Sequence, residues 1–260
     1  GWIDIRGSIM ICDMHVHTEF SCDSDADMIK YYSIGRQRNI DVICFTEHVD
    51  YNENDFGYGY YNPVAYFEKL SPIKNSRDLE VLAGLEFSEP HLYNEQLREL
   101  AKYPYDFILG SIHWVGDMFP FPETLEKYSA DYFYSLYWPE VLEAVTKGGF
   151  DSLAHIDFPK RYYKKLIYDE KMIIKIFNIM IEQKIVLEIN TSSLRKGLPT
   201  LMPDEGLLKL YKQCGGKYVT IGSDSHFEND LGAGIDYAQK IMHRIGLEQV
   251  VFRKRIMVIE

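Results

Sequence analysis

Seven short apolar runs alternate with segments of helical periodicity along almost the whole chain. This alternation is typical of βα units, in which helices connect the strands of a parallel sheet. The predicted strands are Met10–Met14, Asp41–Thr46, Glu80–Phe87, Asp106–Ile112, Asp151–Ala154, Ile185–Ile189 and Tyr218–Gly222. The predicted helices are Asp27–Arg38, Pro63–Asn75, Glu95–Ala101, Ala130–Lys147, Asp169–Gln183, Pro203–Cys214 and Ala233–Ile245, with Pro63 and Pro203 in first turns.

No linker or low-complexity tract interrupts the pattern, so we expect one domain over residues 10–260. Seven βα units in one domain predict an α/β fold of the TIM-barrel type, closed or nearly closed. The segment Gln249–Ile259 is expected to add a terminal strand. Residues 1–9 lack a signal-peptide pattern, and Arg6-Gly-Ser8 before Met10 suggests a leftover of an expression vector.

Charge and cysteine content narrow the range of partners. The formal net charge of −11 argues against a nucleic-acid scaffold, and no stretch is long and apolar enough to span a membrane. The four cysteines form no Cys-x-x-Cys pattern, which favours reduced thiols and a cytoplasmic location. The expected partner is a small molecule, and the oligomeric state stays open.

Six of the eight histidines lie where a predicted strand ends. His15 and His17 are two residues apart on the first strand, so both side chains project from one face. In a parallel barrel the carboxyl ends of the strands form one face, where active sites are built. The side chains expected to converge there are His15, His17, Asp23, His48, Glu86, His113, His155, Asp224 and His226.

Nitrogen and oxygen ligands without a thiolate suit Zn, Mn or Fe. One such histidine is ordinarily a polar residue bonded to the backbone, but six at strand ends are hard to explain in that way. Nine side chains exceed what one ion uses, and we therefore predict two or three divalent metal ions.

The motifs at these strand ends resemble those of the PHP (polymerase and histidinol phosphatase) superfamily, most closely its histidinol-phosphate phosphatases. They occur in the family's order and span nearly the whole chain. The resemblance implies a distorted seven-stranded (β/α) barrel with a trinuclear metal centre. The motifs are His15-Val-His17-Thr18, Phe45-Thr-Glu-His48, Gly84-Leu-Glu86, Gly110-Ser-Ile-His113, Ala154-His155 and Gly222-Ser-Asp-Ser-His226.

The resemblance also implies a ligand set for each ion. His15, His17, Glu86 and Asp224 would hold the first ion. Glu86 would bridge to a second ion, completed by His113 and His155. The third ion would take Asp23, His48 and His226. Many family members have histidine where this chain has Asp23, and a carboxylate favours a harder ion there.

The implied activity is a phosphomonoesterase of histidine biosynthesis. Metal-activated hydroxide would attack phosphorus and convert L-histidinol phosphate to L-histidinol and phosphate. Arg161 and Arg195 would bind the phosphate, with Lys160 and Lys196 as solvated neighbours. Asp23, His226 or a bound water would protonate the leaving alkoxide. The predicted catalytic residues are therefore Asp23 and His226, together with the bridging Glu86. The candidates for imidazole and amine recognition are Tyr58, Trp114, Phe119 and Glu123.

Three other interpretations are weaker. A PHP-type phosphatase or nuclease acting on a nucleotide or other phosphoester would prefer a basic surface, which a net charge of −11 disfavours. Amidohydrolases commonly bridge their metals through a carboxylated lysine, whereas the third strand here offers Glu86. A metal-storing barrel without catalysis is disfavoured because every ligand position is filled.

Overall fold

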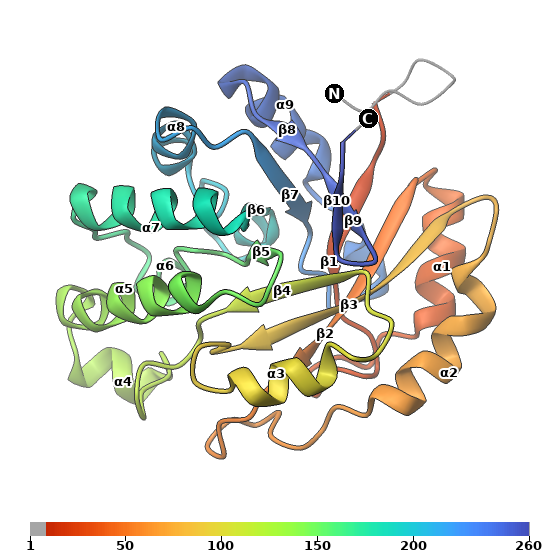
Figure 1. The fold of residues 1–260 in the computed structure, drawn as a ribbon, viewed down its shortest axis with the longest axis horizontal. Coiled ribbons are helices and arrows are strands. Elements are labelled where there is room, and N and C mark those ends of the chain that lie inside the picture. Colours follow the sequence, from red (N-terminus) through yellow and green to blue (C-terminus); the bar gives the residue numbers. More distant parts are fainter. Residues whose placement is uncertain (1–8, 260) are drawn as a thin grey trace.

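The computed structural model describes residues 9–259; residues 1–8, most of the segment ascribed to an expression vector, lie outside it. Within this range, eight parallel strands form one sheet in sequential order, and helices surround it (Figure 1). The fold class is confirmed, but the strand number is eight rather than seven. The strands are β1 (Cys12–Val16), β2 (Val42–Val49), β3 (Glu80–Ser88), β4 (Phe107–Ser111), β5 (Ser152–Leu153), β6 (Val186–Asn190), β7 (Tyr218–Gly222) and β8 (Glu248–Gln249).

The sheet is closed at only one end of the β1–β7 seam. Near the carboxyl ends, the His17 amide donates to the Ser225 carbonyl at 2.8 Å, and the Asp224 amide donates to the His15 carbonyl at 2.8 Å. At the amino end of the seam, β8 pairs with Tyr218 and Val219 of β7. The predicted terminal strand is thus split: two residues join the sheet, and β9 (Val251–Arg253) pairs with β10 (Ile256–Val258) as a hairpin.

Most helices begin at a polar residue that caps the first turn. The side chains of Asp27, Asn62, Ser129 and Asp169 each accept a backbone N–H there. Pro203 is not a first-turn proline, because Asp204 is the cap and its helix begins one residue later. The helices are α1 (Met28–Gln37), α2 (Pro63–Lys74), α3 (Asn94–Leu100), α4 (Pro122–Lys127), α5 (Ala130–Lys147), α6 (Lys160–Tyr163), α7 (Glu170–Gln183), α8 (Glu205–Gln213) and α9 (Ile235–Ile245).

Two apolar cores hold the barrel together. The larger lies between sheet and helices, and the smaller fills the interior with side chains such as Cys12, Met14, Cys44 and Phe107. Phe252 of the hairpin stacks on Phe107 at a ring-centroid distance of 5.3 Å. The interior is therefore filled beneath the carboxyl ends of the strands. No helix within residues 9–259 is long and apolar enough to cross a membrane.

Candidate metal centre

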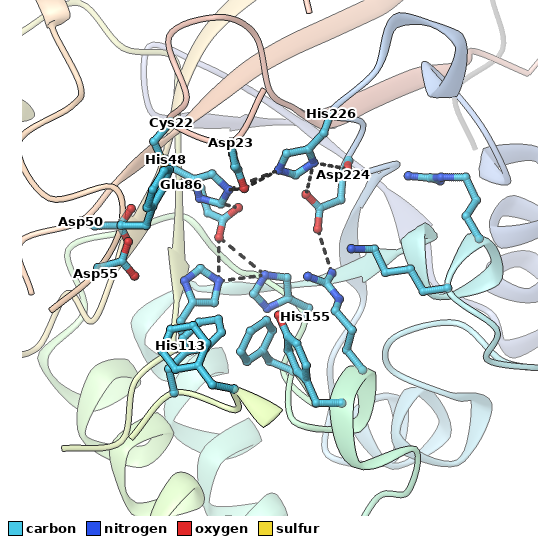
Figure 2. A pocket seen from close by; sticks show the side chains of 18 of the residues that line it. Cys22, Asp23, His48, Asp50, Asp55, Glu86, His113, His155, Asp224 and His226 are labelled. Atoms are coloured by element: carbon cyan, nitrogen blue, oxygen red, sulfur yellow. Dashed lines mark hydrogen bonds and ion pairs between the residues drawn. The ribbon is translucent and has the colours of Figure 1, made fainter. Parts of the chain in front are cut away.

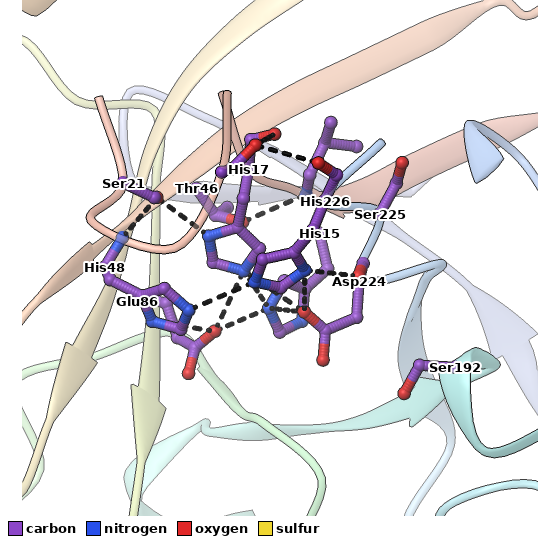
Figure 3. Close-up of polar contacts among 12 residues, drawn as sticks. His15, His17, Ser21, Thr46, His48, Glu86, Ser192, Asp224, Ser225 and His226 are labelled. Carbon is purple, nitrogen blue, oxygen red and sulfur yellow. Dashed lines mark hydrogen bonds and ion pairs between the residues drawn. The ribbon is translucent and has the colours of Figure 1, made fainter. Parts of the chain in front are cut away.

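A bulge in β1 turns the two histidines of the first strand into the barrel. Cys12 and Met14 belong to the interior core, and in a regular strand His15 would face away from it. The pairing of β1 with β2 shifts register between Asp13 and Val16, and such bulges re-aim the side chains that follow them. Both His15 and His17 consequently point toward the residues at the other strand ends (Figure 3).

The first group of side chains contains His15, His17, Glu86 and Asp224. Each offers one ligand atom within 4.8 Å of the others, and all four residues are buried. The Nε2 atoms of His15 and His17 are 3.0 Å apart, and Glu86 Oε1 lies 2.6 Å from His15 Nε2. Asp224 Oδ1 lies 3.2 Å from His17 Nε2. The four residues that the resemblance joined at one ion are adjacent.

Glu86 also faces a second group through its other oxygen. Glu86 Oε2 lies 3.1 Å from His113 Nε2 and 3.6 Å from His155 Nε2. The two histidine nitrogens are 3.4 Å apart. One carboxylate therefore contacts two separate pairs of histidines through its two oxygens, which is the arrangement that a bridging ligand requires.

The third predicted group is Asp23, His48 and His226 (Figure 2), and the buried His17 of the first group also offers a ligand atom beside these two histidines. Asp23 Oδ2 lies 3.3 Å from His48 Nε2 and 3.1 Å from His226 Nε2, and these two nitrogens are 3.4 Å apart. The Asp23 side chain is 46% exposed and lines the pocket, so it is the part of this group most open to solvent.

These spacings and the unpaired atoms fit divalent ions. Two ligands held 2.0–2.1 Å from a tetrahedral ion lie about 3.3 Å apart, close to the separations of the histidine nitrogens. Among residues 9–259, Glu86 Oε2 and Asp224 Oδ1 are buried without a hydrogen-bond partner. Both oxygens nevertheless face an imidazole nitrogen, His113 Nε2 at 3.1 Å and His17 Nε2 at 3.2 Å. A buried carboxylate oxygen without a hydrogen-bond donor is costly, and a cation between each oxygen and the facing nitrogen would remove that cost.

The charges in this protein without its ions also indicate a cation site. Burial lowers the pKa of His15, but Asp224, Glu188 and Glu86 together raise it well above the ordinary value. Burial also lowers the pKa of His48, but Asp23 and Glu86 raise it, and the pKa lies well above the ordinary value. The pKa values of Glu86 and Asp224 lie well below normal despite burial, because neighbouring histidines favour the charged carboxylates.

Four histidines are held through their second ring nitrogen, and for His226 the partner of Nδ1 is the Asp224 carbonyl at 2.9 Å. Nδ1 of His17 lies 3.0 Å from Ser21 Oγ, and Nδ1 of His113 lies 3.0 Å from Ser88 Oγ. Nδ1 of His15 lies 2.5 Å from Glu188 Oε2. These partners were missed from the sequence, although Glu188 leaves one signal there: it is an acidic residue inside the apolar strand β6.

A pocket of about 500 Å³ opens above the three groups. Arg161, Arg195 and Lys196 line it. Arg161 Nη2 donates to Asp224 Oδ2 at 3.0 Å, and its Nε is buried without a hydrogen-bond partner in the described part of the chain. Arg195 donates to the Ser223 carbonyl at 2.7 Å. The structure thus places both predicted phosphate-binding arginines beside the metal-ligand candidates.

The opposite side of the pocket is acidic and aromatic. Asp50 and Asp55 lie across the histidines from Asp224 (Figure 2), and Phe119 and Phe121 line the same pocket. Asp55 Oδ2 accepts the Trp114 indole N–H at 2.6 Å. Of the four residues predicted to recognise imidazole and amine, only Phe119 lines this pocket; Tyr58, Trp114 and Glu123 do not.

Lys160 is not a solvated neighbour of the site. It is 4% exposed, with Nζ 2.7 Å from Asp157 Oδ2 and 2.9 Å from the Leu201 carbonyl, which lies on another loop. These contacts attach helix α6, which carries Arg161, to the loop after β6. Lys160 therefore helps to orient the neighbouring arginine.

Comparison with known proteins agrees with the resemblance found in the sequence motifs. The PHP domain family matches residues 13–192. The chain is 32% identical to a probable histidinol-phosphatase of Clostridium acetobutylicum, covering 95% of this chain and 99% of that protein. It is 25% identical to the histidinol-phosphatase of Lactococcus lactis, covering 92% of each. The crystal structure of histidinol phosphate phosphatase from Lactococcus lactis, complexed with zinc, L-histidinol and phosphate, shares the fold: TM-score 0.84, 22% identity, 97% of this chain and all of that chain.

Proposed function

This chain belongs to the PHP domain family, and we propose that it is a metal-dependent histidinol-phosphatase. It would hydrolyse L-histidinol phosphate to L-histidinol and phosphate in histidine biosynthesis, in the cytoplasm. One observation carries the proposal: the nine candidate ligands lie in and beneath a pocket that two arginines also line. The relatives named histidinol-phosphatase match across nearly their whole length.

We assign two or three divalent ions to the three groups as the resemblance implies. His15, His17, Glu86 and Asp224 would hold one ion, and Glu86 would share a second with His113 and His155. Asp23, His48 and His226 would hold the third. When bound, the ions supply an activated water nucleophile and offset charge on the phosphoryl oxygens.

The side chains around the ions would bind and orient the substrate. Arg161 and Arg195 present planar donors to the phosphate, which suits the geometry of its oxygens. The Asp23 side chain is 46% exposed at the open part of the centre, where Asp23 or a bound water would pass a proton to the leaving alkoxide, because both ring nitrogens of His226 would be occupied. Asp50 and Asp55 would face the cationic end of histidinol phosphate, with Phe119 against its imidazole ring.

Phosphate release from a panel of monoesters tests this function. We expect the metal-loaded protein to release phosphate from L-histidinol phosphate with a higher kcat/KM than from p-nitrophenyl phosphate, because only the former carries a cationic amine that can pair with Asp50 and Asp55. Removal of the metal with a chelator should abolish both activities, and added Zn²⁺ or Mn²⁺ should restore them. No phosphate release from L-histidinol phosphate by the reloaded enzyme would rule the proposal out.

Metal binding should release protons and strengthen as pH rises. Because the pKa values of His15 and His48 are raised well above normal in the metal-free protein, both rings hold protons near neutral pH. An ion must displace these protons, so its affinity should fall as pH is lowered from 8 to 6. Calorimetric titration with Zn²⁺ in two buffers of different ionisation enthalpy measures the release. Equal heats in both buffers would contradict the expectation.

A further inference from the structure

β6 contributes no candidate metal ligand, yet it carries a buried carboxylate directed at the centre. Glu188 lies in the middle of β6 and is 1% exposed. Its Oε2 lies 2.5 Å from His15 Nδ1. The opposite ring nitrogen of His15 faces Glu86 and Asp224 at 2.6 and 3.3 Å. Glu188 therefore holds the side of the imidazole ring that points away from the candidate ion.

The second oxygen of Glu188 is also occupied. Oε1 accepts the His155 backbone N–H at 3.0 Å and the Asn190 side-chain N–H at 3.0 Å. His155 has φ +22°, a conformation that non-glycine residues rarely adopt and that its surroundings must hold. Glu188 thus contacts one member of the first group through its ring and one member of the second group through its backbone.

The contact between Glu188 and His15 differs from those of the other supported rings. In the other supported rings Nδ1 faces a neutral group: a serine hydroxyl for His17 and His113, and the Asp224 carbonyl for His226. His15 has a carboxylate instead. A carboxylate at Nδ1 can only accept a hydrogen bond, which fixes the ring proton on Nδ1 and leaves Nε2 free to bind a metal. Such a partner also makes the ligating nitrogen more basic.

We propose that Glu188 is a positioning residue of the metal centre, which orients His15 for the first ion and holds the backbone of His155 for the second. The proposal rests on the metal centre assigned above. It predicts that one isosteric change in β6 weakens the binding of two ions, although Glu188 itself contacts neither ion.

Glu188→Gln is a sharp test because an amide cannot satisfy all three donors. If its oxygen accepts from His155 and Asn190, its NH₂ faces His15 Nδ1 and drives the ring proton to Nε2, where the ion would bind. If the amide is flipped, its NH₂ meets the two other N–H donors. We expect Zn²⁺ affinity to fall about 10–100-fold, with fewer ions bound per chain at limiting Zn²⁺.

Ser88→Ala serves as the matched control, because it removes the partner of one ring, that of His113. Its effect should be smaller and confined to one ion. Zn²⁺ affinity and stoichiometry are measured by competition with a chromogenic chelator, so the result does not depend on the substrate. If the wild-type protein binds fewer than two ions, the proposed metal centre is ruled out. If Glu188→Gln binds Zn²⁺ as the wild type does, only the proposed role of Glu188 is ruled out.

Thermal unfolding separates positioning from a purely structural role. In the metal-free protein, Glu188→Gln leaves one of three buried donors unsatisfied, so we expect Tm to fall by several degrees. The rise in Tm on adding Zn²⁺ should shrink. Equal losses of Tm with and without Zn²⁺ would overturn the proposal. If this variant does not fold, Glu188→Asp, too short to reach both His15 and His155, is tested in the same way, and wild-type affinity would again overturn it.

Discussion

Replacing Glu86 with glutamine is expected to lower kcat for L-histidinol phosphate on the order of 10³-fold or more. The two oxygens of Glu86 face separate pairs of histidines, and an amide leaves only one oxygen able to bind a cation. The distance between two ions would then no longer be fixed. Elemental analysis should show fewer ions per chain than the nearly three expected for the loaded wild-type enzyme.

Glu205→Gln is the matched control for this change. Glu205 also pairs with a basic side chain, Arg244, but neither residue lines the pocket. The control variant should keep the wild-type metal content and most of its activity. Wild-type turnover by Glu86→Gln at full metal occupancy would contradict the bridging assignment.

Replacing Arg161 with alanine should lower kcat/KM about 10²-fold while leaving the metal content unchanged. A hydrogen bond to a charged group contributes about 1.5–3 kcal/mol, and the Arg161 guanidinium is placed to offer the phosphate more than one. Its Nε is buried and lacks a hydrogen-bond partner among residues 9–259, so the guanidinium keeps a donor that no described protein group uses. Steady-state kinetics together with elemental analysis measure both quantities.

Two further variants separate geometry from charge. Arg161→Lys keeps the positive charge but not the planar donor pair, and we expect it to recover only part of the lost activity. Lys164→Ala removes an exposed cation at the end of the same short helix, where Lys164 Nζ contacts the Lys196 carbonyl. Wild-type kcat/KM in Arg161→Ala, or an equal loss in Lys164→Ala, would show that Arg161 does not bind the phosphate directly.

The strands and the convergence of candidate ligands were predictable from the sequence. Each such residue follows an apolar run in a βα unit, and the topology of parallel strands brings these ends together whatever their distance along the chain. His48 and His226, for example, are far apart in sequence, yet their Nε2 atoms are 3.4 Å apart. The metal-binding role of each residue stays a prediction. The arrangement of the side chains favours bound ions, and the roles depend on those ions.

Other features depend on contacts that leave little trace in the sequence pattern. The bulge after Asp13 arises from pairing with β2, and the burial of Lys160 depends on the Leu201 carbonyl of a separate loop. The eighth strand has two residues, too few for periodicity to reveal. Asp50 and Asp55 line the pocket because of the path that a long loop takes. The sequence shows the composition of this loop but not its path.

The partly open seam between β1 and β7 gives the metal centre a mechanical role. His15 comes from β1 and Asp224 follows β7, so an ion held by both would act as a cross-link between residues more than two hundred positions apart. Unlike a disulfide, such a link exists only while the site is assembled, so the free energy of metal binding adds directly to the stability of the folded barrel. The two ends of the sheet would then be fastened by the same ions that perform the chemistry, so that demetallation would loosen the barrel at its seam as well as stop the reaction.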